Sequence, residues 1–169
     1  MSWYRRDRTP GATWFFTVLT DHRWPWLCEA GARYALRSAF DATRLGHAFA
    51  IDAFVLLPDH LHCVMTLPEG DADFSLRWSQ VKRRTTWALR DHPTLSRARW
   101  QRRFWEHRIR NEDDLARHVD YIHFNPVKHG LVDRVSEWPH SSFHRFVAHG
   151  DLARDWGDRP PDVSGRFGE

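Results

Sequence analysis

The sequence predicts an α+β sandwich, in which helices pack mainly on one face of an antiparallel sheet of four to five strands. Its 169 residues correspond to one ordinary domain. Segments typical of strands and helices follow one another in the order β-α-β-β-α-β-α. The turn dipeptide Pro58-Asp59 joins two of the strands so closely that they pair antiparallel. This order of elements resembles a ferredoxin-like fold.

The first half of the chain is expected to contribute three strands and one helix. Residues 13–20 are rich in β-branched and aromatic side chains, which favour a strand. Pro25 suits a first helical turn, so we expect a helix over residues 26–44. The apolar run within residues 47–57 predicts a second strand, and residues 61–67 predict the third.

The second half is expected to contribute two helices and one short strand. Apolar side chains predict a helix over residues 73–90, and residues 104–110 are expected to form the fourth strand. Asn111 is a suitable N-cap for a further helix, because acidic residues follow it and acids stabilise a first turn. We expect Pro126 to end that helix, at about residue 125.

Residues 1–150 are expected to form the single domain, and residues 151–169 a short charged tail. The tail is rich in Gly and Pro and is expected to be loosely ordered. No apolar run approaches the roughly 20 residues that cross a membrane, and no secretory signal opens the sequence. The two cysteines provide no disulfide framework, so we expect a protein of the reducing cytoplasm.

Positive charge is concentrated between residues 77 and 110, where eleven Lys and Arg side chains face only two acidic ones. Such a block is typical of a surface that binds a polyanion. Five aromatic side chains lie within it, and aromatic rings among basic residues favour base stacking. The block therefore indicates nucleic-acid binding, with a solvated arginine-rich face as the alternative.

His60 and His62 lie at the start of the predicted third strand, with one residue between them. Side chains along a strand alternate between faces, so the two imidazoles project from the same face and can chelate one divalent ion. Twelve histidines in the chain make this spacing expected about once by chance. Taken alone, the motif also fits two partly exposed surface histidines.

Tyr121 and Asn125 are four residues apart on the predicted last helix, so they lie one above the other. The apolar stripe of that helix comprises Leu115, Val119 and Ile122, and the tyrosine and asparagine lie beside it. A phenol and an amide can thus face one site, and an amide oxygen is a suitable metal ligand. A tyrosine that packs its ring and an asparagine that precedes a proline are the alternatives.

Four segments of the sequence resemble the IS200-like Y1 transposase family, and three of them its REP-associated tyrosine transposase branch. Residues 58–65 read PDHLHCVM, residues 100–104 WQRRF, residues 121–132 YIHFNPVKHGLV and residues 138–143 WPHSSF. The matches keep the order of the family from about Trp14 to Phe146. His129 stands where a smaller residue is more usual, which bears on local backbone packing.

The resemblance implies a metal-dependent enzyme that acts on single-stranded hairpin DNA from repeated extragenic palindromes in a bacterial cytoplasm. It implies that His60, His62 and Asn125 bind Mg²⁺ or Mn²⁺, without a small-molecule cofactor. It implies that Tyr121 is the nucleophile, which cleaves and rejoins the strand through a 5′-phosphotyrosine. The short spacing lets one chain complete its own site, so a monomer is favoured over a homodimer.

Further roles are assigned by position. His118 is the preferred proton acceptor for Tyr121, because it lies three residues before it on the same side of the helix, whereas His123 points elsewhere. The predicted contacts to the DNA backbone are made by basic side chains of the block: Lys82, Arg83 and Arg84, followed by Arg102 and Arg103. The last two would lie near the metal if the fourth strand neighboured the third.

Three other functions fit part of the pattern. A non-catalytic hairpin-binding protein derived from a transposase would share the basic block and the aromatic side chains. A two-histidine phosphoesterase would need a second His-x-Ser/Thr motif paired with the first, and the sequence offers no such pair. A structural zinc module would need closely spaced cysteines, which Cys28 and Cys63 do not provide.

Overall fold

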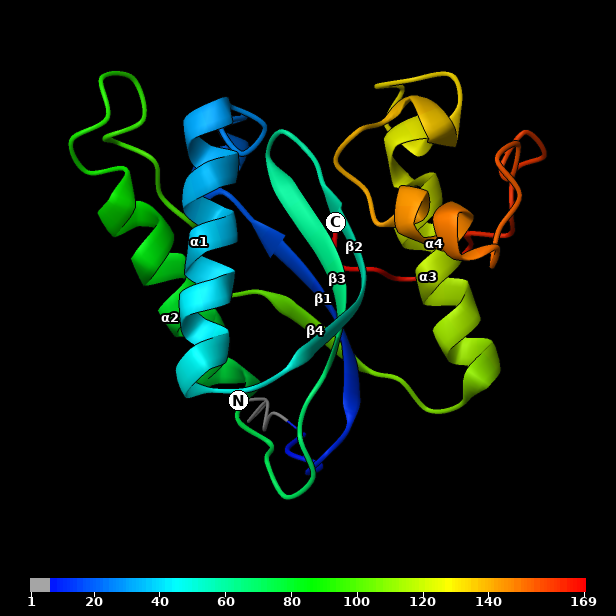
Figure 1. The fold of residues 1–169 in the computed structure, drawn as a ribbon, viewed down its shortest axis with the longest axis horizontal. Coiled ribbons are helices and arrows are strands. Elements are labelled where there is room, and N and C mark those ends of the chain that lie inside the picture. Colours follow the sequence, from blue (N-terminus) through cyan, green and yellow to red (C-terminus); the bar gives the residue numbers. More distant parts are fainter. Residues whose placement is uncertain (1–6) are drawn as a thin grey trace, which may run out of the picture.

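The computed structural model describes residues 7–169, and its centre is a four-stranded sheet (Figure 1). The strands lie in the order β2-β3-β1-β4, and every neighbouring pair is antiparallel. Their bounds are β1 Thr13–Leu19, β2 Ala50–Leu56, β3 His60–Thr66 and β4 Trp105–Arg108. The short Pro58-Asp59 connection makes β2 and β3 a hairpin, as the sequence predicts.

Helices cover both faces of the sheet (Figure 1). Helices α1 and α2 pack on one face, and α3 and α4 lie on the other. The bounds are α1 Ala30–Gly46, α2 Phe74–Ala88, α3 Glu112–Lys128 and α4 Phe143–His149, with single 3₁₀ turns at Asp21–Arg23 and Val135–Glu137. The predicted α+β sandwich with an antiparallel sheet is confirmed. The expectation that helices pack mainly on one face is wrong, because the apolar side of α3 buries the second face of the sheet, with Ile122 packed against Phe15 and Val64.

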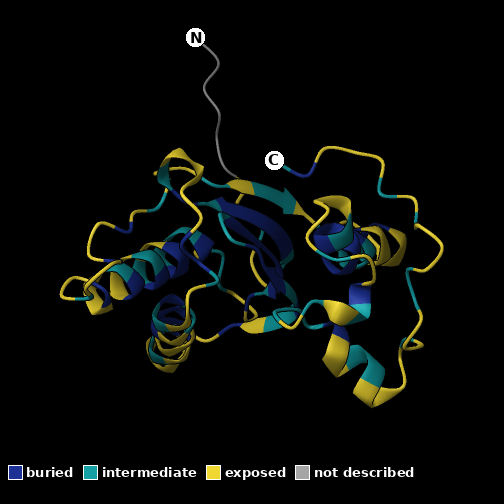
Figure 2. Cartoon of the chain, turned by 90° about the horizontal axis from the view of Figure 1, so that it is seen from above, coloured by how far each residue is buried: buried dark blue, intermediate teal, exposed yellow. Residues whose placement is uncertain are grey.

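Strand β1 is buried along nearly its whole length because both of its faces are covered. Trp14 and Phe16 point into the core under α1 and α2, whereas Phe15 between them points toward α3. Figure 2 shows the strands as the most buried part of the chain. The face under α3 is the one on which the predicted site residues meet.

The sequence predicts that Pro126 ends the helix that begins after Asn111. This prediction is wrong, since that helix, α3, continues to Lys128. Proline lacks an N–H, but it lies in the final turn, where its loss costs a single helical bond. Backbone bonds from His129 N to Asn125 O and from Leu131 N to Pro126 O then close the helix end. The extra turn matters, because it brings Lys128 and His129 to the site.

Residues 150–169 contain neither helix nor strand, yet the tail is packed rather than loosely ordered. Trp156 lies against Phe143, and Phe167 is buried in the cluster between the sheet and α3. Figure 2 shows this segment passing around the α3 side of the molecule and returning to the sheet. The tail is packed although most of it is polar, because burial of its apolar side chains, Trp156 and Phe167, favours docking on α3.

Within residues 7–169, none of the helices combines the length and the apolar character that crossing a membrane requires.

Candidate functional site

The two predicted metal-binding histidines lie side by side on β3, facing α3. Their rings are 4.9 Å apart between centroids, and both side chains are almost fully buried. In the sheet, His62 lies opposite Thr17 of β1. The period of the strand therefore brings the two imidazoles to one face, as predicted from their spacing.

Each histidine is oriented through its Nδ1 atom. His60 Nδ1 donates to the Asp59 carboxylate at 2.7 Å, and a carboxylate only accepts hydrogen bonds. His62 Nδ1 lies 2.8 Å from the Thr17 hydroxyl, whose proton is donated to the Phe167 carbonyl. The Asp59 carboxylate thus fixes the proton of His60 on Nδ1, whereas His62 Nε2 lies 2.8 Å from the Glu169 carboxylate, which can only accept a hydrogen bond.

Helix α3 brings Tyr121 and Asn125 against these rings. The Tyr121 ring lies 5.2 Å from that of His62, and Asn125 Nδ2 lies 3.3 Å from His62 Nε2. Both side chains are buried. Asn125 Oδ1 is buried without a hydrogen-bond partner anywhere in residues 7–169. The four residues that the sequence predicts as nucleophile and metal ligands thus form one cluster within one chain.

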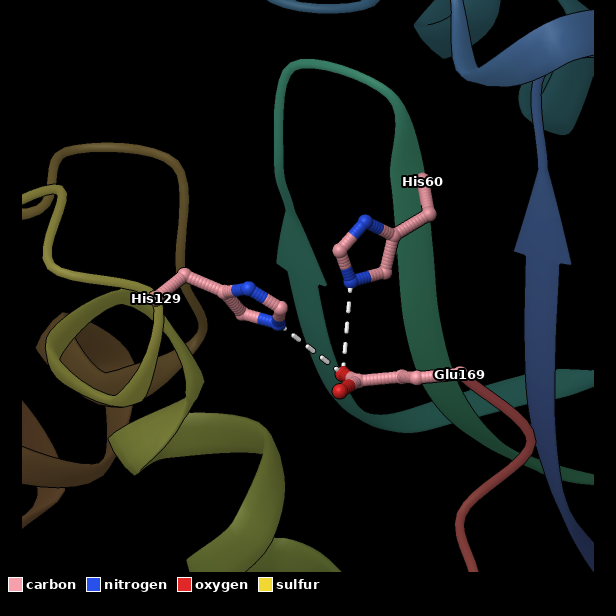
Figure 3. Close-up of side chains that lie close together, drawn as sticks. All are labelled: His60, His129 and Glu169. Carbon is pink, nitrogen blue, oxygen red and sulfur yellow. Dashed lines mark hydrogen bonds and ion pairs between the residues drawn. The ribbon is translucent and has the colours of Figure 1, made fainter.

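The C-terminal tail closes this cluster, a contact that sequence reasoning missed. Phe167 stacks on Tyr121 with ring centroids 3.6 Å apart and planes at 10°. Glu169 reaches into the histidine pocket, where Figure 3 shows its carboxylate between His60 and His129. A cavity of about 630 Å³ lies beside Tyr121, between Trp105 of β4 and the tail.

Lys128 and His129, which follow on α3, are also absent from the sequence-based site. Lys128 Nζ donates to the Tyr121 hydroxyl at 3.0 Å and forms an ion pair with Glu169. His129 Nε2 lies 3.2 Å from Glu169 Oε1, and its ring lies 5.1 Å from that of His60. The departure from the family pattern at His129 therefore concerns the site itself. The sequence did not indicate this position, because it depends on α3 continuing past Pro126 to Lys128.

Burial shifts the protonation equilibria of the site. It lowers the pKa of His62 to about 4, so its imidazole is neutral at pH 7. Burial and the adjacent Glu169 carboxylate raise the pKa of Tyr121 above its ordinary value. Burial alone would raise the pKa of Glu169, but hydrogen bonds from surrounding groups, His129 foremost, hold it well below its usual range. A neutral imidazole thus faces an ionised carboxylate.

The donor set of the pocket suits a divalent cation. The two imidazoles offer their Nε2 atoms, and rotation of the Asn125 amide would add its unpartnered oxygen. Nitrogen and oxygen donors of this kind bind Mn²⁺, and Mg²⁺ when water completes its shell. Asp59 and Thr17 supply the outer hydrogen bonds that metal-binding histidines ordinarily make.

His118 lies on the predicted side of α3, but a different group contacts the nucleophile. Its Nδ1 bonds the Asp114 carbonyl at 2.7 Å, and its ring stacks on His107. Among residues 7–169 it makes no hydrogen bond with Tyr121; Phe167 packs against both rings. Its role as proton acceptor stays a prediction, whereas Lys128 Nζ donates a hydrogen bond to the phenol.

His123 faces away from the site, as the sequence predicts, and is buried against Phe143 and Phe146. Burial lowers its pKa to about 4 from an ordinary 6.5. The unfolded chain therefore takes up a proton below about pH 6.5 that the folded chain resists until pH 4. Above pH 6.5 His123 does not change the stability of the fold with pH. As the pH falls from 6.5 to 4, the folded state loses stability relative to the unfolded state.

We expect His123→Gln to reduce the dependence of the unfolding free energy on pH between 4 and 6.5. The difference in slope approaches about 1.4 kcal/mol per pH unit. Urea unfolding of the wild type and the variant across this range measures it, and the two should run parallel above pH 7. Identical slopes throughout would show that His123 does not titrate abnormally.

The predicted DNA-binding side chains do not form one group. Lys82, Arg83 and Arg102 line a cavity of about 480 Å³ between α2 and the loop before β4. Arg84 and Arg103 are exposed but do not line that cavity. Lys82 bonds the Gln101 carbonyl, which joins the helix to the loop.

The condition for placing Arg102 and Arg103 near the metal is not met. Strand β4 pairs with β1, so β1 separates it from β3 and its histidines. The loop before β4 instead meets the end of β1, where Gln101 N bonds Leu19 O. The order of strands in the sheet, which short connections alone do not determine, accounts for the difference.

Comparison with known proteins gives two relatives that span nearly the whole chain, although no family model matches it. The REP-associated tyrosine transposase of Escherichia coli (strain K12) is 48% identical over 164 residues, or 97% of this chain and 96% of the relative. A Haemophilus influenzae protein that carries the same family name is 43% identical over 170 residues, or 95% and 96%.

Two solved structures resemble the fold. One is a REP-associated tyrosine transposase bound to a REP hairpin, with a TM-score of 0.86 and 48% identity; the match covers 100% of this chain and 98% of that chain. The other is a transposase structure from Deinococcus radiodurans, with a TM-score of 0.50 and 15% identity over 72% of this chain and 95% of that chain. The second likeness extends to the fold alone.

Proposed function

Because the chain belongs to the REP-associated tyrosine transposase family, we propose that it cleaves and rejoins single-stranded hairpin DNA through Tyr121. The observation that carries the proposal is the position of Tyr121 beside the His60 and His62 pair. A phenol, two imidazoles and an amide meet in one buried pocket. This combination suits attack on a phosphodiester whose charge is offset by a cation.

His60, His62 and Asn125 would hold the ion, Mg²⁺ or Mn²⁺. When bound, such an ion polarises a scissile phosphate and offsets the charge that develops on its oxygens. Asp59 and Thr17 hold the imidazoles with Nε2 toward the pocket. This fixed orientation lowers the cost of ordering the ligands when the ion binds.

We expect Asp59→Ala to weaken Mn²⁺ binding by about 10- to 100-fold, because outer hydrogen bonds of metal ligands have effects of this size. Titration calorimetry with Mn²⁺ measures the change. Arg23→Ala is the matched control, since Arg23 is the other partner of the Asp59 carboxylate, at 2.8 Å. Equal affinities of wild type and Asp59→Ala would contradict a role for this carboxylate in orienting His60.

In the proposed reaction the Tyr121 oxygen attacks phosphorus while the bond to the 3′ oxygen breaks. The phenol proton passes to an acceptor, for which His118 is the sequence-based candidate, and the departing 3′ oxygen gains a proton. Lys128 donates to the Tyr121 oxygen and would stabilise the phenolate. The product is a 5′-phosphotyrosine and a free 3′-OH, and attack by a 3′-OH on the phosphotyrosine rejoins a strand.

The basic side chains would bind the DNA backbone. Lys82, Arg83 and Arg102 border one cavity with the partly exposed Trp100 in its lining, a combination suited to phosphates and bases together. Arg84 and Arg103 add exposed positive charge, which favours a polyanion. The solved relative that is described as bound to a REP hairpin supports a hairpin as the partner.

A single chain would complete its own site. Tyr121 lies 5.2 Å from His62 of the same chain, measured between ring centroids, so no second copy is needed to supply the nucleophile. We therefore favour a monomer that acts in cis over a homodimer that shares sites.

The test of the proposed function is incubation with a single-stranded REP hairpin and Mn²⁺, followed by denaturing electrophoresis. A covalent protein–DNA adduct is expected, together with a shortened strand that ends in a 3′-OH. The alternative, a non-catalytic hairpin-binding protein, shares the fold and basic surface. Hairpin binding without any adduct at saturating Mn²⁺ would favour that alternative.

A further inference from the structure

The turn between β1 and α1 has a strained backbone. His22 and Arg23 both adopt the left-handed conformation, with φ of 51° and 57°. Within residues 7–169 they are the only residues other than glycine that have a positive φ. A side chain disfavours this conformation, and native structures retain it chiefly at functional sites, where surrounding contacts hold it. The strain therefore points to a function of this turn.

Asp59, the residue before His60, holds the turn in place. Its backbone carbonyl accepts hydrogen bonds from both the backbone N and the hydroxyl of Thr20, each at 2.9 Å. Its carboxylate binds Arg23 Nε at 2.8 Å through Oδ2 and His60 Nδ1 at 2.7 Å through Oδ1. One carboxylate thus joins the Arg23 guanidinium to a proposed metal ligand.

Arg23 also lies close to the proposed nucleophile. Burial and the Glu169 carboxylate raise the pKa of Tyr121, and the positive charge of Arg23 is among the effects that oppose this rise. Such an effect requires the guanidinium to lie within electrostatic range of the phenol. The charge of Arg23 is therefore near both the phenol and the histidine pair.

Most of the Arg23 guanidinium is available to a ligand. The side chain is 42% exposed, and the ion pair with Asp59 engages Nε. Within residues 7–169 neither Nη atom has a hydrogen bond or an ion pair. The Nη atoms carry the remaining N–H donors in a planar fork, which matches the oxygens of a phosphate. The anchored Nε fixes the direction of the fork, so that less side-chain entropy is lost on binding.

An exposed aromatic ring follows Arg23 in the chain. Trp24 is 40% exposed, whereas Trp26, two residues further, is buried in the core. An exposed indole beside an exposed guanidinium suits a nucleotide, because the base can stack while the phosphate binds the arginine. The turn thus offers contacts for both parts of a nucleotide.

We propose that Arg23 is a further catalytic residue, which binds a non-bridging oxygen of the scissile phosphate through its Nη atoms. As Tyr121 attacks, negative charge grows on the non-bridging oxygens. A fixed guanidinium stabilises this charge more strongly in the transition state than in the bound substrate. Arg23 stays protonated throughout, so the bonds that form and break are those of the proposed reaction. This inference rests on the proposed function.

A purely structural role of Arg23 is the alternative. If Arg23 only held Asp59, and through it His60, its loss would weaken Mn²⁺ binding, as loss of the Asp59 carboxylate is expected to do. If Arg23 binds the phosphate, its loss leaves Mn²⁺ binding unchanged and slows the reaction. Metal affinity and reaction rate, measured on the same variants, therefore separate the two roles.

The first measurement is the single-turnover rate of adduct formation with saturating REP hairpin and Mn²⁺. Arg23→Ala is expected to lower this rate about 100-fold or more, the effect of removing one donor to a transition-state oxyanion. Arg44→Ala is the matched control, because Arg44 on α1 is 43% exposed and is also paired with an aspartate. Its rate should equal that of the wild type. A wild-type rate in Arg23→Ala would overturn the proposal.

The second measurement is titration calorimetry of the DNA-free proteins with Mn²⁺. Arg23→Ala should bind Mn²⁺ as the wild type does, and weakening of the size expected for Asp59→Ala would show that Arg23 acts through Asp59 alone. Arg23→Gly provides a second variant if Arg23→Ala fails to fold, because glycine adopts a φ of 57° without strain. The same rate and affinity are expected of it.

The third measurement isolates the contact with phosphate. A hairpin with a methylphosphonate at the cleavage position, which the shortened strand identifies, lacks the charge of one non-bridging oxygen. In EDTA, Tyr121→Phe should bind this hairpin about tenfold more weakly than the phosphate hairpin, the effect of losing one hydrogen bond to a charged group. The double variant with Arg23→Ala should bind both equally. An equal preference for phosphate in the two proteins would overturn the proposal.

The wild type separates this inference from the proposed function. Absence of an adduct from the wild type would reject the proposed function, and the catalytic role of Arg23 with it. A normal adduct from the wild type, together with an undiminished rate in Arg23→Ala, would reject the role of Arg23 alone. Tyr121 would then remain the proposed nucleophile.

Discussion

Tyr121→Phe is expected to abolish the covalent protein–DNA adduct, with adduct formation reduced by at least about a thousandfold, while hairpin binding is retained. The change removes one oxygen, which is the proposed nucleophile, and no other side chain at the site can form the same ester. The phenyl ring can still stack on Phe167 and pack against His62, so the fold should persist. The lost bond to Lys128 lies at the edge of the pocket.

The measurement is adduct yield on a denaturing gel with a labelled hairpin, beside a binding assay on the same preparation. Unchanged binding with no adduct is the expected pair of results. A full adduct yield in the variant would exclude Tyr121 as the nucleophile and direct attention to another residue. Loss of hairpin binding as well would mean that the variant is misfolded, which its thermal unfolding would reveal.

Removal of residues 163–169 is expected to raise the single-turnover rate of adduct formation by about tenfold or more at saturating Mn²⁺. Tyr121 is 1% exposed, and Phe167 covers its ring. Burial of a side chain as large as Phe167 stabilises docking by about 1.5–3 kcal/mol. A closed tail favoured by that amount leaves a tenth or less of the molecules open, and deletion opens them all.

The deletion has a favourable property as a test, since it removes one basic and one acidic residue, Arg166 and Glu169, and preserves the net charge. Electrostatic attraction to DNA should therefore change little. Phe167→Ala should give a smaller increase, because it removes the stacking and keeps the Glu169 carboxylate. A rate equal to that of the wild type would show that the tail does not restrict access to Tyr121.

The sequence reveals some of the features behind these two predictions and not others. The alternation of a strand and the turn of a helix are local, so His60 with His62, and Tyr121 with Asn125, could be paired from spacing alone. Their convergence on one pocket required the resemblance of residues 121–132 to a known family. The chance frequency of the histidine motif shows why spacing by itself was insufficient.

Other parts of the site had no local signal. Lys128 and His129 lie beyond a proline that was expected to end the helix, and whether a final turn continues past proline depends on the contacts of that turn. The tail was expected to be loosely ordered from its glycine and proline content. Composition describes flexibility of the free chain and does not reveal a docking surface for Phe167.

The sequence by itself determined the order of strands and helices as far as α3, the faces to which the site residues project, and the family, but it did not predict α4. Only the tertiary structure decided that α3 packs on the face opposite α1 and α2, that β1 separates β4 from the histidines, and that Glu169 enters the pocket. The physical reason is separation along the chain. Glu169 lies 107 residues from His62, and such a contact depends on how buried surfaces fit together rather than on local propensity.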